Sequence, residues 1–306
     1  MSIRISLAGY QPKTSILCQS LDHLAKRLSA NCSQKIELNI TYNIMESGHA
    51  PSTLPSLISS RQYDIGFIAT SYFAHTIPEL YIFDLPFVIK ERSQAYDLID
   101  NKLFKLVERH FRKRFDLKLL TIWDYGYRHF SNHKHPLTQP HHCRGLRIRT
   151  LLNELHPKMF QALGFKTHTM EVSEYLKQIK SGRHIAQENA LSNFFNFGLQ
   201  KYHPYVSLSG HLIGMAALIC SQDLYDSWPK HIQNHVLEAV QHTTFAQREM
   251  VDEDEQVILK KLIAGGIKVN KLTTSEKNRF SRVLSSVTEP YKDKIGSNLL
   301  SSLENV

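Results

Sequence analysis

The sequence predicts an α/β fold with two lobes, each built on a mostly parallel sheet flanked by helices. Short runs with strand-like alternation are separated by stretches with helical spacing, which is the pattern of βαβ units. The chain has 306 residues, 42% of them hydrophobic and 21% charged. That length is enough for two domains of about 150 residues. A stretch without Pro or Gly, from residue 230 to about 263, predicts one long helix.

The first seventy residues supply three expected strands and one helix. Apolar residues alternate with polar ones at residues 3–7 and again at 35–42, as in half-buried strands. Residues 63–70 form a more continuous apolar run, which is typical of a strand covered on both faces. Residues 15–28 carry leucines at helical spacing and predict a helix.

The long helix constrains the organisation of the whole chain. A helix of about 30 residues spans roughly 45 Å, which is too long for one small domain. We therefore expect this helix to cross both lobes.

Two arginines lie beside strand-like alternation in the middle of the chain. In the run from Gly145 to Thr150, Leu146 and Ile148 alternate with Arg147 and Arg149. Arg149 is expected at the carboxyl end of this strand, where open α/β sheets bind ligands, and the helical pattern that follows is expected to begin at residue 151. A guanidinium can hold both oxygens of a carboxylate. Spacing alone leaves two interpretations of Arg149 open, a ligand contact and a solvated or structural arginine.

Seven segments across nearly the whole chain resemble one family in order and spacing. They are FDLPFV at 83–88, GYRHFSN at 126–132, GLRIRT at 145–150, FQALGFKTHTM at 160–170, QEN at 187–189, SLSGH at 207–211 and YDSWP at 225–229. The chain resembles the substrate-binding proteins of tripartite ATP-independent periplasmic (TRAP) transporters, the DctP family. The resemblance implies a two-lobed fold like that of periplasmic binding proteins. We expect residues 1–122 and 211–249 in lobe I, and 123–210 and 250–306 in lobe II.

The resemblance also implies a carboxylate site. It assigns Arg149 to the ligand carboxylate, Arg128 to the same cleft, and Asn189 to a further contact with the carboxylate. We add Gln187 as a further candidate substrate-binding residue. The candidates for the far wall of the pocket are Thr70, Tyr10, Gln11, Tyr72 and Phe194. Ala186 and Ala190 stand where the family usually has Gly and Pro, which leaves the path of this loop and the identity of the substrate open.

The implied function is extracytoplasmic solute binding. We expect a periplasmic monomer that closes on a small organic acid in an interlobe cleft and delivers it to the membrane subunits of a TRAP transporter. The alternative is a ligand-sensing protein of the same fold that signals to a receptor or kinase. No secretory leader pattern is present at residues 1–12. Because the resemblance implies export, we expect either a mature form that starts with a replacement Met or a leader that is missing for another reason.

Other classes of function lack their signatures. The chain has no G-x-S-x-G, H-E-x-x-H, glycine-rich phosphate loop or Rossmann fingerprint, and we expect neither an enzyme nor a cofactor. The net charge is +9, and residues 109–118 are the densest basic run. Phenylalanines at helical spacing indicate a water-facing amphipathic helix there, and we expect no nucleic-acid partner. No apolar run approaches the roughly 20 residues of a membrane span.

Histidines and cysteines raise the possibility of a metal site. His133, His135, His141 and His142 lie close to Cys143, and imidazole with thiolate is a zinc or copper ligand set. Because two prolines and a lysine interrupt the stretch, we expect a surface loop and no metal. The cysteines show no paired spacing, and we expect buried free thiols at Cys18, Cys32, Cys143 and Cys220.

Overall fold

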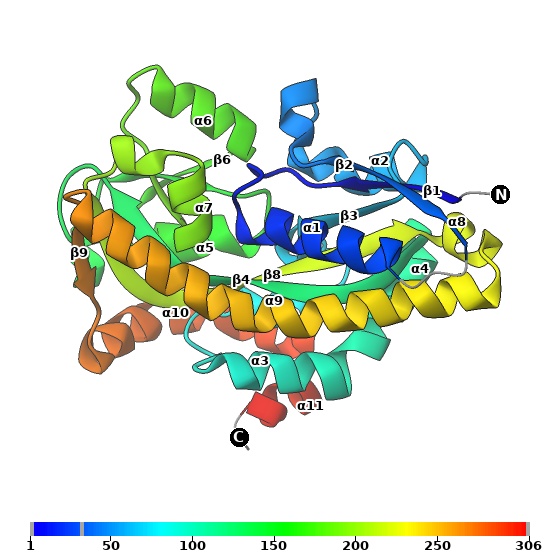
Figure 1. The fold of residues 1–306 in the computed structure, drawn as a ribbon. Helices are drawn as coiled ribbons and strands as arrows, with labels where there is room; N and C mark the ends of the chain where they lie inside the picture. Colours follow the sequence, from blue (N-terminus) through cyan, green and yellow to red (C-terminus); the bar gives the residue numbers. More distant parts are fainter. Residues whose placement is uncertain (1–2, 31–33, 304–306) are drawn as a thin grey trace. The chain divides into compact units, whose positions relative to one another are not determined.

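The computed structural model describes residues 3–30 and 34–303 (Figure 1). The chain divides into two compact units, and each unit is made of three separate stretches. The first unit holds residues up to 69, 104–125 and 215–254, and the second holds 70–103, 126–214 and those from 255 onward. The divisions at 125, 214 and 254 lie close to the expected 122, 210 and 249. Residues 70–103, however, belong to the second unit, whereas we expected them in lobe I.

The first unit has a sheet in the order β2-β1-β3-β8. Strand β1 pairs in parallel with both β2 and β3, and β3 pairs antiparallel with β8. The strands are β1 (Ile3–Ala8), β2 (Ile36–Thr41), β3 (Ile65–Ala69), the first part of β4 (Leu117–Asn132) and the second part of β8 (Tyr205–Ser221). The helices are α1 (Ile16–Ser29), α2 (Leu54–Ser59), α4 (Phe104–Phe115), α8 (Gln222–Ser227) and the first part of α9 (Lys230–Ala264).

The second unit has the strand order β4-β7-β5-β6, with β9 paired to β8. The pairs β7 with β5, β5 with β6 and β8 with β9 are parallel, and only the pair β4 with β7 is antiparallel among these described pairs. Its own strands are β5 (Arg147–Thr150), β6 (Lys166–Thr169), β7 (Ala186–Ala190) and β9 (Lys268–Lys271). Its α-helices are α3 (Arg92–Leu98), α5 (Leu155–Ala162), α6 (Val172–Lys180), α7 (Leu191–Asn196), α10 (Thr274–Ile295) and α11 (Ser297–Leu300).

Short helices complete both units. The 3-10 helices are η1 (Ile44–Ser47) and η2 (Pro51–Thr53) in the first unit, and η3 (Thr70–Tyr72), η4 (Pro78–Phe83), η6 (Pro140–Cys143), η7 (Leu199–Lys201) and η8 (Ser301–Leu303) in the second. Segment η5 (Ile99–Leu103) is a π-helix that continues α3 into α4. None of the helices in the described ranges is long and apolar enough to cross a membrane.

The expected elements of the first seventy residues are confirmed. Strands β2 and β3 lie within the predicted stretches, and β1 extends one residue beyond its own. Helix α1 begins after Ser15, whose hydroxyl accepts a hydrogen bond from the backbone N–H of Cys18 at 3.3 Å. Such a cap satisfies one of the donors that every helix start leaves without a partner. The basic run also forms the expected amphipathic helix, α4, with Val107 and Phe111 buried.

The long helix is confirmed as well. Helix α9 runs unbroken for 35 residues, from yellow to orange in Figure 1. Its residues 230–254 belong to the first unit and 255–264 to the second, so one helix contributes to both.

The expected start of the helix after β5 was wrong. Helix α5 begins at Leu155, and Leu152 is 41% exposed instead of taking part in a helical apolar face. The side-chain oxygen of Asn153 accepts hydrogen bonds from the backbone N–H groups of Leu155 and His156, at 2.8 and 3.1 Å. This Asn therefore fixes the start of the helix four residues after the predicted one.

Cys18, Cys143 and Cys220 are free and buried, as expected, and Cys32 lies outside the described residues. Burial raises the pKa of the Cys18 thiol to about 12. It also raises the pKa of Cys143 and Cys220 above the ordinary value. Thiols that stay protonated at neutral pH are poor nucleophiles and poor metal ligands, so these three act as small apolar core residues.

Candidate carboxylate site

Three neighbouring strands of the second unit carry the residues that we expected to bind a carboxylate. Arg128 lies opposite Ala190 where β4 pairs with β7, and Arg149 lies opposite Gln187 where β5 pairs with β7. Because side chains alternate along a strand, Gln187 and Asn189 share the face of Arg149, whereas Glu188 shares the face of Arg128. The strand β7 thus separates the two arginines and offers each a different partner.

Arg149 is a buried cation. Its side chain is 4% exposed, and its Nε donates a hydrogen bond to the backbone carbonyl of Met170 at 2.9 Å. Within residues 3–30 and 34–303, its two terminal nitrogens have no hydrogen bond to protein and its charge has no ion-pair partner. A buried charge is costly unless an opposite charge accompanies it. Arg147, two residues earlier, is exposed to solvent.

Arg128 has its counter-charge within the protein. Its Nε lies 2.6 Å from Oε2 of Glu188, and one terminal nitrogen lies 2.7 Å from Oε1. The two side chains are 5% and 0% exposed. Burial alone would raise the pKa of the Glu188 carboxyl, but the Arg128 charge and its hydrogen bonds hold this pKa below the ordinary value. The pair is therefore a bidentate ion pair with both charges kept.

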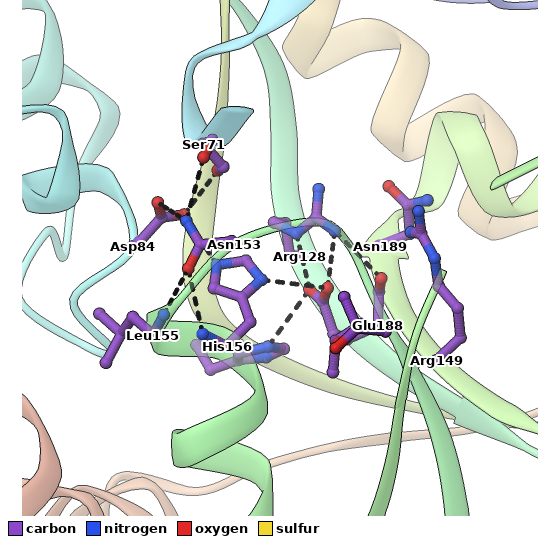
Figure 2. A network of polar contacts seen from close by, with 12 residues as sticks. Ser71, Asp84, Arg128, Arg149, Asn153, Leu155, His156, Glu188 and Asn189 are labelled. Atoms are coloured by element: carbon purple, nitrogen blue, oxygen red, sulfur yellow. Dashed lines mark hydrogen bonds and ion pairs between the residues drawn. The ribbon is translucent and has the colours of Figure 1, made fainter. Parts of the chain in front are cut away.

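A polar network surrounds this ion pair (Figure 2). His156 lies between two carboxylates, with Nε2 at 2.8 Å from Oδ1 of Asp84 and Nδ1 at 3.9 Å from Oε1 of Glu188. The Asp84 carboxylate also accepts hydrogen bonds from the Ser71 hydroxyl at 2.6 Å and from the Asn153 amide at 3.0 Å. The network therefore connects the start of α5 to β4 and β7.

His211 approaches Glu188 from β8. Its Nε2 lies 3.6 Å from Oε2 of Glu188, and its ring stacks on Phe130 with centroids 4.2 Å apart. Burial lowers the pKa of His211 below its ordinary value, against the opposing effect of Glu188, so the imidazole is neutral at pH 7. The main charge compensation of Glu188 therefore comes from Arg128.

Asn189 lies near Arg149 and is held by its own neighbours. Its side-chain oxygen accepts hydrogen bonds from the backbone N–H of Ala190 and from the side-chain amide of Asn193, both at 3.0 Å. In Figure 2 the Asn189 amide and the Arg149 guanidinium extend toward the same side of their strands. The structure thus places Arg149 and Asn189 on the same face of neighbouring strands, and it gives Arg128 a protein partner.

Gln187 lies in a buried chain of hydrogen bonds. Its amide donates to the Ser131 hydroxyl at 3.2 Å, and Ser131 bonds Nδ1 of His203 at 2.8 Å. Nε2 of His203 lies 2.9 Å from the Ile185 carbonyl, and burial lowers the pKa of this ring to about 3. The neutral ring therefore carries its proton on Nε2, and the Gln187 amide has its partner inside the protein.

Three other candidates lie elsewhere in the second unit. Phe194 is buried in a hydrophobic cluster with Tyr175, Ile179 and their neighbours, and its ring stacks on that of His203 with centroids 6.4 Å apart. Tyr72 donates a hydrogen bond to the Glu171 carboxylate at 2.9 Å. Glu171 directly follows Met170, whose carbonyl binds Arg149. Thr70 is buried at the start of η3, and its carbonyl accepts from the N–H of Phe73.

Two candidates belong to the first unit. Tyr10 is 6% exposed and packs against Phe67 with ring centroids 5.5 Å apart. Gln11 is completely buried, and neither its side-chain oxygen nor its nitrogen has a hydrogen-bond partner within the described part of the chain. Buried amides almost always have partners, so this one marks a position where a polar partner is missing.

The sequence reasoning missed the buried network. Asp84, His156, Glu188 and His211 were not chosen as site residues, although Glu188 lies between two residues that were. One signal was available, since Asp84, Glu188 and His211 all occur within the segments that carry the family resemblance.

The histidine-rich loop does not form a metal cluster. His141 and His142 have ring centroids 4.4 Å apart, and His133 stacks on His184 at the same distance. Over the ranges that the structure covers, no group of three or more His, Cys, Asp or Glu side chains is placed to hold a metal ion.

Solved structures share this fold over the whole chain. The sugar acid binding protein DctPAm from Advenella mimigardefordensis, in complex with galactonate, is 22% identical, covers 98% of this chain and 97% of its own, and has a TM-score of 0.92. A TRAP periplasmic solute-binding protein from Sulfurospirillum deleyianum with bound succinate is also 22% identical, covers 100% of both chains and has a TM-score of 0.91. These likenesses confirm the expected fold class.

Curated relatives and a family model give the same assignment. The C4-dicarboxylate-binding periplasmic protein DctP of Rhodobacter capsulatus is 22% identical over 229 residues, which are 74% of this chain and 68% of that protein. The 2,3-diketo-L-gulonate-binding periplasmic protein YiaO of Escherichia coli is 22% identical over 246 residues, which are 79% of this chain and 74% of that protein. The family model matches residues 7–294. The chain therefore belongs to the bacterial extracellular solute-binding proteins of family 7, the DctP family.

Proposed function

We propose that this protein captures a small organic acid by its carboxylate and delivers it to the membrane subunits of a TRAP transporter. The carboxylate is bound by the two terminal nitrogens of Arg149, with the amide nitrogen of Asn189 as a further donor. The observation that carries the proposal is that Arg149 is only 4% exposed and that its guanidinium makes no ion pair with any described residue. A carboxylate supplies both the missing charge and the planar geometry that a guanidinium fork matches.

Arg128 has a supporting role in this proposal. Its charge is compensated by Glu188 at 2.6 and 2.7 Å, so it adds little net attraction for a second anion. The ion pair and the His156–Asp84 contact hold the strand β7 and the start of α5 in place. This arrangement keeps Asn189 next to Arg149 in the absence of ligand, which lowers the cost of ordering the site on binding.

The relatives support a carboxylate as the ligand class. Structures similar to this chain were determined with galactonate, succinate and D-erythronate, and all three ligands are carboxylates. The contributions of Gln11, Thr70, Tyr10, Tyr72, Gln187 and Phe194 stay predictions.

The same proposal concerns location and assembly. Proteins of the DctP family are periplasmic, and we propose that this one acts there as a monomer without a cofactor or a catalytic role. Size-exclusion chromatography with light scattering tests the monomer, because a dimer would have twice the 35.3 kDa mass of the single chain.

Calorimetric titration tests the ligand class. The protein is unfolded and refolded to remove any bound ligand, and is then titrated with succinate, galactonate, D-erythronate and a broad panel of monocarboxylates. We expect at least one acid to bind and to raise the melting temperature, since ligand at 100 times Kd adds about 2.7 kcal/mol of stability. Indifference to the whole panel would refute the proposal. Arg147→Gln is the matched control for Arg149→Gln, because Arg147 is exposed on the same strand.

A further inference from the structure

Asn193, the third residue of α7, has a side-chain oxygen without a partner. The residue is 6% exposed, and its Oδ1 is buried and accepts no hydrogen bond from any described residue. Its Nδ2 donates to Oδ1 of Asn189 at 3.0 Å. Leaving a buried acceptor unsatisfied is costly, so a donor from outside the protein is expected to complete it.

The orientation of both amides is fixed by the backbone. The N–H of Ala190 can only donate, and it points at Oδ1 of Asn189 at 3.0 Å. The atom of Asn193 that bonds the same oxygen must therefore be its nitrogen. It follows that Asn189 presents a nitrogen donor, and Asn193 presents an oxygen acceptor, to whatever completes the pair.

Arg149 and Asn189 therefore offer hydrogen-bond donors to a ligand, whereas Asn193 offers an acceptor. Arg149 and the nitrogen of Asn189 are donors and suit the two oxygens of a carboxylate. A carboxylate cannot satisfy Oδ1 of Asn193, because an ionised carboxylate only accepts hydrogen bonds. A ligand hydroxyl can donate to this oxygen. Because the Asn193 amide is hydrogen-bonded directly to Asn189, which is proposed to bind the carboxylate, we expect the hydroxyl to lie close to the carboxylate in the ligand.

Among the described residues, the buried part of β4, β5 and β7 offers no second unpaired cation beside Arg149. Arg128 is already paired with Glu188, and Glu171, which follows Met170 in the chain, adds a negative charge. The buried charges on these strands therefore suit one ligand carboxylate better than two.

From this balance we infer that the ligand is a 2-hydroxy monocarboxylate, whose hydroxyl donates to Oδ1 of Asn193 while its carboxylate binds Arg149 and Asn189. The inference rests on the proposed function and narrows its substrate class. Asn193 is a specificity-determining residue in this account. It selects hydroxy acids over deoxy acids and over 2-oxo acids, which carry an acceptor in place of the hydroxyl donor.

The test compares probes that differ by one group. Wild-type protein is titrated calorimetrically with butanoate, with (R)- and (S)-2-hydroxybutanoate, with 2-oxobutanoate and with succinate. We expect one hydroxy enantiomer to bind roughly 5- to 150-fold more tightly than butanoate, the range set by leaving one buried polar group unsatisfied. The oxo acid and succinate should gain no such advantage. Equal affinity for butanoate and both hydroxy enantiomers overturns the inference, and this comparison needs no variant.

Variants assign the preference to one side chain. In Asn193→Ala the advantage of the hydroxy acid over butanoate should fall below about 3-fold, as in a double-mutant cycle that removes one shared interaction. Asn196→Ala is the control, because Asn196 lies on the same helix and its amide bonds the Ser192 carbonyl at 2.8 Å. A full advantage retained in Asn193→Ala overturns the role of Asn193.

The outcomes also separate this inference from the proposed function. If butanoate and succinate bind in an Arg149-dependent manner but the hydroxyl adds nothing, the carboxylate site stands and the inference fails. If no acid in the panel binds, both fail together.

Discussion

Arg128 and Arg149 lie on the two strands that flank β7, yet they differ in how their charge is compensated. Arg128 is held by Glu188 through two short contacts, whereas Arg149 has only the Met170 carbonyl at 2.9 Å among the described residues. The two residues are equally buried, at 4% exposed each. Burial by itself therefore does not separate Arg128 from Arg149, which we propose binds the ligand. The presence or absence of an internal counter-charge does separate them.

The largest expected effect is on stability, from removing the partner of Arg128. Glu188→Ala leaves a buried guanidinium without its counter-charge, and we expect a loss of about 3–5 kcal/mol in the free energy of unfolding. Urea denaturation of ligand-free protein measures this loss. Arg149→Ala is the matched control and should cost far less stability, since it removes a charge that is uncompensated already. Equal losses in the two variants would abolish the distinction between the arginines.

The next effect is on binding. Arg149→Lys should weaken carboxylate binding nearly as much as Arg149→Ala, because an ammonium on a flexible stem cannot reproduce the planar two-point contact. Losing one partner of a desolvated charge pair costs about 2–5 kcal/mol, which is roughly 30- to several-thousand-fold in affinity. Calorimetric titration with the acid found by the panel measures both variants. Wild-type affinity in Arg149→Lys would mean that charge alone suffices.

A smaller effect is expected in the acid stability of the Arg128 pair. The pKa of Glu188 is lowered in the folded state, so the unfolded state binds more protons once the pH falls below the ordinary Glu pKa of about 4.3. The stabilisation is present above that pH and is lost as the pH falls, by up to about 1.4 kcal/mol per pH unit for one proton. Unfolding curves between pH 5 and 3, taken for wild type and Glu188→Gln, measure it. The variant should show the shallower slope, and parallel slopes would contradict the assignment.

The smallest effect is expected at the exposed neighbour of the binding arginine. Arg147→Lys exchanges one solvated cation for another and should change carboxylate affinity by less than about 0.5 kcal/mol. The titrations that measure Arg149→Lys measure this variant as well. If Arg147→Lys lost carboxylate affinity and Arg149→Lys kept it, the proposed site would be misplaced by two residues along β5.

Local patterns predicted most of the elements, and long-range pairing decided the site. The alternation around Ile148 placed Arg149 at the end of β5, which the structure confirms. Whether Arg128 or Arg149 meets Glu188 depends on the antiparallel register of β4 on β7, in which Phe130 lies opposite Glu188. Sixty residues of sequence separate Arg128 from Glu188, and no spacing rule encodes that register.

One local expectation failed. The leucines at 151 and 152 looked like the start of a helix, but the Asn153 side chain accepts hydrogen bonds from the backbone N–H groups of Leu155 and His156, and the helix starts at Leu155. Phe194 lies in the apolar cluster around Tyr175, and its place at the wall of the pocket stays a prediction.

The interleaving of the chain governs how this protein acquires its structure during synthesis. The first unit starts with residues up to 69 and is completed only by residues 215–254, and the second unit needs residues from 255 onward. At synthesis rates of 5–20 residues per second, roughly 10 to 40 seconds pass between the first and last stretches of the first unit. For that period the nascent chain holds strands without all of their neighbours, so neither unit can be released as a finished folding domain before the other is nearly made. The proposed carboxylate site, which depends on β4, β7 and β5 together, would thus form late, as a property of the completed chain.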